Sequence, residues 1–199
     1  NDISFVGAHP IAGSEQRGIE YATEDLFEES TCIITPFHGR GSEAEKVRRC
    51  GSDNQNTKSL EYDRAIETIT SLWQLLGARV KILTPEAHDE ILASVSHLPH
   101  TTASCLINAI RQDYLAYGAG GLRDTTRVAS GDPELWRDIF RQNRENVIKT
   151  IDQLVVELNG FKDDLVNRNY DKIVGRLKKA KASRDGLFQD NSAGQEQHK

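Results

Sequence analysis

The sequence predicts a partial α/β unit followed by an all-helical domain. Short β-branched runs with a helical repeat between them occupy the first 84 residues. Beyond residue 84, apolar residues recur at helical spacing and no strand pattern is found. We therefore expect an α/β portion at residues 1–84, a helical domain at residues 85–182 and a polar tail at residues 183–199.

In the α/β portion, strands are expected at residues 3–7, 31–35 and 80–83. Apolar residues at helical spacing predict a helix from Ile66 to Leu76, which Gly77 ends. Residues 37–61 are polar, contain Gly and Ser and lack periodicity, so we expect a long exposed insertion there.

In the helical portion, Thr84 and Pro85 carry the residue types of a helix start. The expected elements are a helix interrupted at Pro99 and continuing to Ile110, a Gly-rich break at residues 118–131, a long helix from Asp132 to Leu158 closed by Asn159 and Gly160, and an amphipathic helix from Phe161 to Ala180. The apolar stripes exceed what one small bundle can bury, which suggests faces left for a partner.

Composition narrows the class of function. With a net charge of −5, the chain has no overall positive field that would attract nucleic acid or anionic lipid. No apolar run is long enough for a spanning helix, and no leader is recognisable. Three cysteines without metal-type spacing favour a reducing, cytoplasmic setting. Because the chain contains no Met, we expect it to be processed or cut from a longer protein.

His9 is the first candidate for chemistry. It lies in the segment GAHPIAGSEQRG and is expected to follow a strand, where open α/β sheets place their sites. An imidazole titrates near neutral pH, which suits a general base. The alternative is a turn histidine without a role.

A second cluster is SVSHLPHTTAS, in which His97 and His100 lie three residues apart. That spacing permits a metal pair, but His88 and Cys105 are expected on other faces and no third ligand is apparent, so we expect no metal site. The two histidines then cap or satisfy a helix kinked at Pro99, or form the polar wall of a substrate pocket.

The segment GAGGLRDTTR is the third cluster. Its glycines permit close backbone approach to a ligand, and Arg123 and Arg127 offer a fork for a carboxylate. A surface turn with a local ion pair to Asp124 is the alternative. No G-x-G-x-x-G register fits these glycines. Trp136, in the helix start that follows, is expected to be a core or interface residue.

Four separated segments occur in an order that resembles the prephenate/arogenate dehydrogenase family: GAHPIAGSEQRGIEYA, CIITP, PEAHDEILASVSHLPHTTA and GGLRDTTRVASGDPELWRDIF. The resemblance covers most of the chain from Phe5 to about Leu158. It implies part of a Rossmann domain followed by an all-helical domain that binds substrate and forms a homodimer. It also implies the oxidative decarboxylation of prephenate or arogenate with NAD or NADP, in tyrosine biosynthesis.

The resemblance also implies roles for individual residues. His9 would accept the proton of the substrate hydroxyl, and Arg127 would hold a substrate carboxylate. Trp136 would reach toward the partner subunit's site. The remaining expected pocket residues are Glu15, Ser96, His97 and His100.

The chain departs from the family in lacking the amino-terminal G-x-G-x-x-G unit that cradles a pyrophosphate. We therefore expect the chain alone to bind NAD weakly and to be inactive. A non-catalytic dimerisation or ligand-sensing module derived from the family is an alternative function. A dehydrogenase of the 3-hydroxyacid group is a third possibility, but no matching lysine motif is found.

Overall fold

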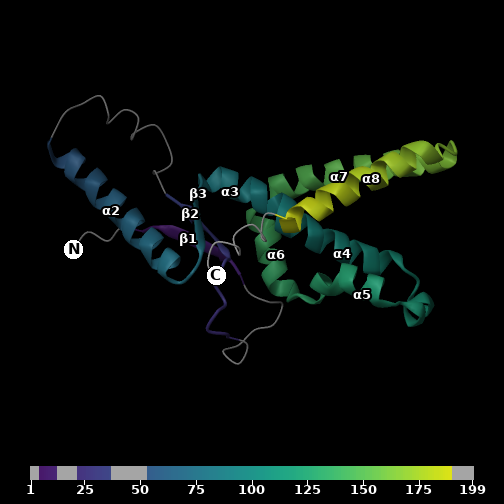
Figure 1. The fold of residues 1–199 in the computed structure, drawn as a ribbon, viewed down its shortest axis with the longest axis horizontal. Coiled ribbons are helices and arrows are strands. Elements are labelled where there is room, and N and C mark those ends of the chain that lie inside the picture. Colours follow the sequence, from purple (N-terminus) through teal and green to yellow (C-terminus); the bar gives the residue numbers. More distant parts are fainter. Residues whose placement is uncertain (1–4, 13–21, 37–52, 190–199) are drawn as a thin grey trace. The chain divides into compact units, whose positions relative to one another are not determined.

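The computed structural model describes residues 5–12, 22–36 and 53–189 and has the α/β-then-helical order that the sequence predicts (Figure 1). The chain divides into two compact units, Asn1–Val147 and Ile148–Lys199. The first unit contains the sheet and most of the helices, and the second contains most of one long helix and all of the last. None of the described helices combines the length and apolar character needed to cross a membrane.

A three-stranded sheet opens the first unit, in the order β1 (Gly7–Ile11), β2 (Thr31–Thr35) and β3 (Arg79–Ile82). β1 runs antiparallel to β2, and β2 runs parallel to β3. The β-branched run of β2 lies in the centre of the sheet, where Cys32, Ile33 and Ile34 are almost fully buried. These three side chains form the core of the sheet.

Helix α2 (Asp53–Leu75) connects the parallel strands β2 and β3, which makes a βαβ unit. The edge of Trp73 in this helix packs against the ring of Phe27, with ring centroids 5.1 Å apart. Gly77 ends the helix at φ +84°. Its N–H donates to the Gln74 carbonyl, and the Ala78 N–H donates to the Trp73 carbonyl, each at 3.0 Å. This pair of bonds satisfies the last carbonyls of the helix and turns the chain into β3.

Helix α3 (Pro85–Leu92) begins where the sequence predicts, because the Thr84 hydroxyl accepts a hydrogen bond from the Ala87 N–H at 3.1 Å. A π-helical turn, η2 (Ala93–His97), joins it directly to α4 (Leu98–Ala109). The Leu98 N–H bonds the Ala93 carbonyl five residues back. This widened turn carries the helix into Pro99, which has no N–H to donate.

Short helices follow, and then the long helix α7. The elements are η3 (Gln112–Tyr117), α5 (Gly120–Thr126), η4 (Arg127–Ser130), α6 (Pro133–Gln142) and α7 (Arg144–Val166). Asp132 caps α6 by accepting hydrogen bonds from two backbone N–H groups, with Pro133 in the first turn, as its sequence predicts.

In the second unit, α7 and the last helix, α8 (Tyr170–Gln189), are joined by a turn in which Arg168 has a φ of +56°. Arg176 of α8 donates to the buried Asp164 carboxylate at 2.8 Å and to Glu157 at 2.9 Å on α7. These two bonds fix the register between the helices.

Two expectations for the α/β portion are wrong. The first strand is Gly7–Ile11 rather than residues 3–7, because its backbone pairs with β2 in a register that sets His9 opposite Ile33. His9 therefore lies within a strand and does not follow one. Residues 53–61 belong to α2 and not to a loop, and the rest of the predicted insertion, residues 37–52, lies outside the described residues.

Three expectations for the helical portion are also wrong. The Gly-rich stretch is largely helical, since α5 begins at Gly120. The predicted helix from Asp132 to Leu158 is two helices separated at Asn143, whose side-chain amide donates a hydrogen bond to the backbone carbonyl of Asp89 in α3. Gly160 does not end α7, which continues to Val166. A Cβ at Gly160 would lie 2.7 Å from the Arg176 guanidinium, so this glycine makes room for α8. The last helix accordingly begins at Tyr170 and not at Phe161.

We expect Gly77→Ala to destabilise the first unit by about 1–2 kcal/mol, because a side chain is strained at positive φ and its Cβ would lie 3.2 Å from the Glu28 Cα atom. Urea denaturation checks this. Gly121→Ala is the matched control: a Cβ there meets nothing within 4 Å, so the variant should be as stable as the parent or up to about 1 kcal/mol more stable. Equal stability of the two variants would contradict the assignment of Gly77 as an obligatory helix terminator.

Candidate active site

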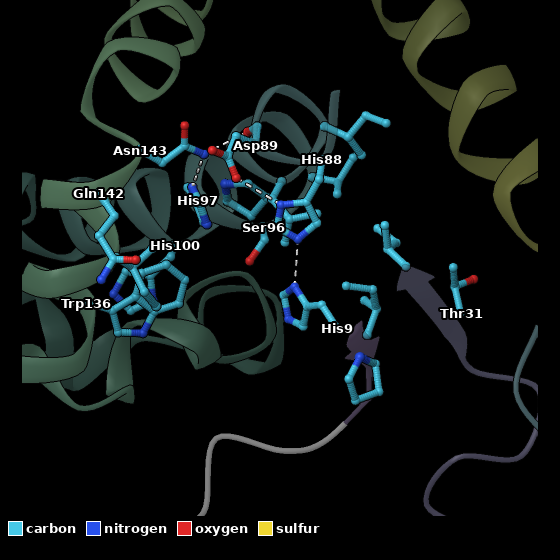
Figure 2. Close-up of a pocket in the computed structure, with 18 of the residues that line it drawn as sticks. His9, Thr31, His88, Asp89, Ser96, His97, His100, Trp136, Gln142 and Asn143 are labelled. Atoms are coloured by element: carbon cyan, nitrogen blue, oxygen red, sulfur yellow. Dashed lines mark hydrogen bonds and ion pairs between the residues drawn. The ribbon is translucent and has the colours of Figure 1, made fainter. Parts of the chain in front are cut away.

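The first unit contains a cleft of about 1020 Å³ between strands β1 and β2 of the sheet and the helices α3, η2, α4 and α6 (Figure 2). Four of the chain's six histidines line it. Its polar or aromatic lining residues are His9, Thr31, His88, Asp89, Ser96, His97, His100, Trp136, Gln142 and Asn143, and its remaining wall is mostly aliphatic. A mostly apolar cleft with a few convergent polar groups is typical of a small-molecule site.

A chain of two hydrogen bonds enters the cleft from α3. Nδ1 of His9 lies 2.8 Å from Nε2 of His88, and Nδ1 of His88 lies 2.9 Å from a carboxylate oxygen of Asp89. Figure 2 shows His9 projecting from β1 toward His88. The side chain of His88 is 19% exposed and that of Asp89 is 50% exposed. The sheet and α3 are thus joined at the cleft through two imidazoles that end on a carboxylate.

The environment of His9 favours the neutral imidazole. Partial burial of its ring lowers its pKa below the ordinary value of 6.5, and the neighbouring His88 lowers it further. A lowered pKa keeps the lone pair of His9 available at neutral pH. This is the protonation state that a general base needs.

His97 lies on the opposite wall, buried at the end of η2. Its Nδ1 is 3.3 Å from the amide nitrogen of Asn143, which also donates to the backbone carbonyl of Asp89 at 2.7 Å. Burial lowers the pKa of His97, and the nearby Asp89 carboxylate opposes part of that shift. Like His9, His97 is held toward its neutral form.

An aromatic wall closes another side of the cleft. The imidazole of His100 stacks on the indole of Trp136, with ring centroids 3.6 Å apart and an interplanar angle of 11°. Phe140 extends this cluster from the next turn of α6, 5.5 Å from Trp136. Burial lowers the pKa of His100, although a backbone hydrogen bond at Val128 partly offsets the effect. Flat, apolar surface of this kind suits a six-membered ring.

The structure brings five of the seven predicted site residues to this one cleft: His9, Ser96, His97, His100 and Trp136. Arg127 does not line it. Its side chain is exposed at the start of η4, next to Val128, which does line the cleft. Glu15 lies outside the described residues.

Sequence reasoning missed three residues of the site: His88, Asp89 and Asn143. The first two follow a strand and a capped helix start, a place where α/β folds concentrate chemistry, so that signal was available. Asn143 carries no local signal, because its partners are 46 and 54 residues away in the sequence.

Within the described part of the chain, no three His, Cys, Asp or Glu side chains are placed to hold a metal ion. The described residues also contain no glycine-rich turn between a strand and a helix that would cradle a pyrophosphate.

Comparison with known proteins agrees with this geometry. Residues 84–179 match the prephenate dehydrogenase dimerization domain, and residues 1–53 match the prephenate dehydrogenase nucleotide-binding domain. The prephenate dehydrogenase of Bacillus subtilis is 31% identical over 92% of this chain and 45% of that protein. The cyclohexadienyl dehydrogenase of Zymomonas mobilis is 28% identical over 94% of this chain and 59% of that protein.

Solved structures give the same result. The prephenate dehydrogenase from A. aeolicus, in complex with hydroxyphenyl propionate and NAD+, has a TM-score of 0.75 and 33% identity over 92% of this chain and 59% of its own. The Synechocystis arogenate dehydrogenase has a TM-score of 0.70 and 25% identity over 92% of this chain and 62% of its own. The chain spans about half the length of the curated relatives it matches. With both domain patterns matched in order and the fold shared, this chain belongs to the prephenate dehydrogenase family.

Proposed function

We propose that this chain is the substrate-binding part of a prephenate or arogenate dehydrogenase, which carries out the NAD(P)-dependent oxidative decarboxylation of prephenate to 4-hydroxyphenylpyruvate in tyrosine biosynthesis. The observation that carries the proposal is His9, hydrogen-bonded to His88 and through it to Asp89, at a cleft with an aromatic wall. The two described cysteines, Cys32 and Cys105, form no disulfide bond, which agrees with a proposed location in the reducing cytoplasm.

The reaction requires few groups from the protein. As hydride leaves the carbinol carbon of the ring, the hydroxyl oxygen must lose its proton, and His9 would accept it. Loss of the ring carboxylate as carbon dioxide then restores aromaticity, so that no second acid or base is required. A bound nicotinamide dinucleotide would supply the hydride acceptor, and the A. aeolicus relative was solved with NAD+.

The aromatic wall suits the ring of the substrate. The stacked pair His100 and Trp136 offers a flat face, while Ser96 and His97 supply polar groups beside it. The hydroxyphenyl propionate bound by the A. aeolicus enzyme carries a phenol at one end and a carboxylate at the other. A ligand of that shape needs a proton acceptor at one end of the cleft and a cation at the other.

We expect His9→Asn in the full-length enzyme to lower kcat by about two to four orders of magnitude with little change in KM, because the general base is lost.

The parent should show a pH dependence with a definite sign. Its kcat/KM should fall as pH drops through the pKa of His9, which lies below the ordinary value of 6.5, and should level off at higher pH, since only the neutral imidazole accepts a proton. Steady-state kinetics from pH 5 to 9 checks both points. An Asn variant that keeps the activity and the acid limb would refute the role of His9, provided that its circular dichroism and melting temperature match those of the parent.

Arg127 is proposed as the cation for a substrate carboxylate, because it directly precedes Val128, which lines the cleft. We expect Arg127→Ala to raise KM roughly 10- to 150-fold, the equivalent of about 1.5–3 kcal/mol for a hydrogen bond to a charged group. Lys should restore part of the affinity, because it keeps the charge and loses the planar fork. Arg123, exposed on the preceding turn, is the matched control, and its Ala variant should change KM less than fivefold. A strong effect at Arg123 with none at Arg127 would assign the carboxylate to the other arginine.

We also propose a homodimer formed through the helices of the second unit, because α7 and the first half of α8 fall within the match to the family's dimerization domain. Val155 and Leu158 are 46% and 61% exposed on one face of α7, and Leu177 is 56% exposed on α8. Exposed aliphatic stripes of this kind are usually covered by a partner.

Sedimentation equilibrium at micromolar concentration should give twice the chain mass. The double variant Val155→Glu/Leu158→Glu should give a monomer with unchanged helicity, because two charges would be buried in the interface. Gln153→Glu, at an exposed polar position on the opposite side of the same helix, is the control and should remain a dimer. A parent that sediments as a monomer would contradict the proposal.

A further inference from the structure

Asp89 is connected to two histidines on opposite walls of the cleft, in each case through one intervening side chain. Its carboxylate bonds His88, which bonds His9. Its backbone carbonyl bonds Asn143, whose amide nitrogen faces His97. Figure 2 shows both connections. Because a neutral imidazole has one donor and one acceptor nitrogen, each connection determines where the proton of the terminal histidine lies.

The first connection can be followed from the carboxylate outward. An ionised carboxylate only accepts, so Nδ1 of His88 must carry the proton that points at Asp89. When His88 is neutral, its lone pair is on Nε2, and the partner atom, Nδ1 of His9, must donate. The lone pair of His9 is therefore on Nε2, the nitrogen that is left for a ligand.

The second connection has the opposite outcome. A backbone carbonyl only accepts, so the Asn143 atom 2.7 Å from the Asp89 carbonyl must be its amide nitrogen. The oxygen of the same amide accepts from Asn146 at 2.9 Å, which agrees with that orientation. Nδ1 of His97 faces the Asn143 nitrogen at 3.3 Å and must accept. The proton of His97 is therefore on Nε2.

We propose that Asp89, acting through His88 and Asn143, holds His9 and His97 in opposite tautomers, so that the cleft presents a proton acceptor at Nε2 of His9 and a proton donor at Nε2 of His97. His88, Asp89 and Asn143 are thereby positioning residues. The ligand class that fits has a hydroxyl donor near β1 and an oxygen acceptor, such as a carbonyl or carboxylate, near η2. The use of the His9 lone pair as a catalytic base rests on the proposed function, whereas the tautomers themselves do not.

The burial and electrostatic environment support the geometry. Tautomers are defined only for neutral rings, and burial lowers the pKa of both His9 and His97. Asn143 is 8% exposed and His97 is 7% exposed, so their contact has little competition from water. A buried amide that satisfies a carbonyl and an imidazole at once has no equally good flipped orientation.

The test is the 15N spectrum of the histidine rings in the full-length protein at pH 8, without ligand. Long-range proton–nitrogen correlations distinguish a protonated from an unprotonated ring nitrogen, and loss of a signal in His9→Asn or His97→Asn assigns it. We expect the proton on Nδ1 of His9 and on Nε2 of His97. A proton on Nε2 of His9, or on Nδ1 of His97, would overturn the proposal.

Four variants separate positioning from a merely structural role. His88→Phe removes the acceptor, so His9 should move to the Nε2–H tautomer that an unconstrained histidine side chain prefers. The value of kcat should fall about 10- to 100-fold, the usual cost of losing an outer hydrogen-bond partner. His88→Gln keeps an acceptor oxygen and should restore both the tautomer and most of kcat. Asp89→Asn, which is close to isosteric, should give His9 a mixture of tautomers. Asn143→Ala should release His97 and leave His9 unchanged.

The crossed pattern makes the result decisive. Each of His88→Phe and Asn143→Ala should alter one ring and spare the other, and the spared ring shows that the cleft is still folded. If both rings keep their tautomers in both variants, the proposal is wrong. If the tautomers behave as expected but His9→Asn remains active, the proposed function fails while the positioning of the two rings stands.

Discussion

The side-chain amide of Asn143 is buried where three parts of the cleft meet, and its hydrogen bonds constrain them all. A buried amide must find partners, because leaving one of its polar atoms unpaired costs about 1–3 kcal/mol. Asn143 finds them in the Asp89 carbonyl of α3 and the His97 ring of η2. To reach them, the residue takes φ −109° and ψ 28° and interrupts the helix between α6 and α7. The same interaction that orders the histidines thus also directs the path of the chain.

The position of α6 follows from that interruption. α6 is a short helix with a capped start, and its direction is set at one end by Asp132 and at the other by Asn143. Held in this way, it lays Trp136 flat on His100 of α4. The aromatic wall of the cleft therefore depends on the break in the helix. In a continuous helix, the helical repeat alone would fix the directions in which the side chains of Trp136 and Asn143 point.

The sheet contributes its part of the cleft through a comparable constraint. β2 is buried at the centre, and its register with β1 places His9 opposite Ile33. β3 leads within three residues to the capped start of α3, so the first turns of that helix lie beside the sheet. His9 and His88, which are 79 residues apart in the sequence, meet at 2.8 Å for this reason. A hydrogen bond at Nδ1 is a common means of orienting an imidazole.

The sequence alone determined the order of α/β and helical portions, the central strand at 31–35, the terminator at Gly77 and the helix starts at Thr84 and Asp132. These features are local, because capping side chains, positive φ and β-branched runs act within a few residues. It also provided the motif that contains His9 and the pair His97 and His100, all of which line the cleft. The tertiary structure decided what depends on distant partners: the strand register around His9, the close approach of Arg176 to Gly160 within α7, and the break at Asn143. The protons of the two histidines belong to this second group, because each is fixed by a hydrogen bond to a residue at least 46 positions away.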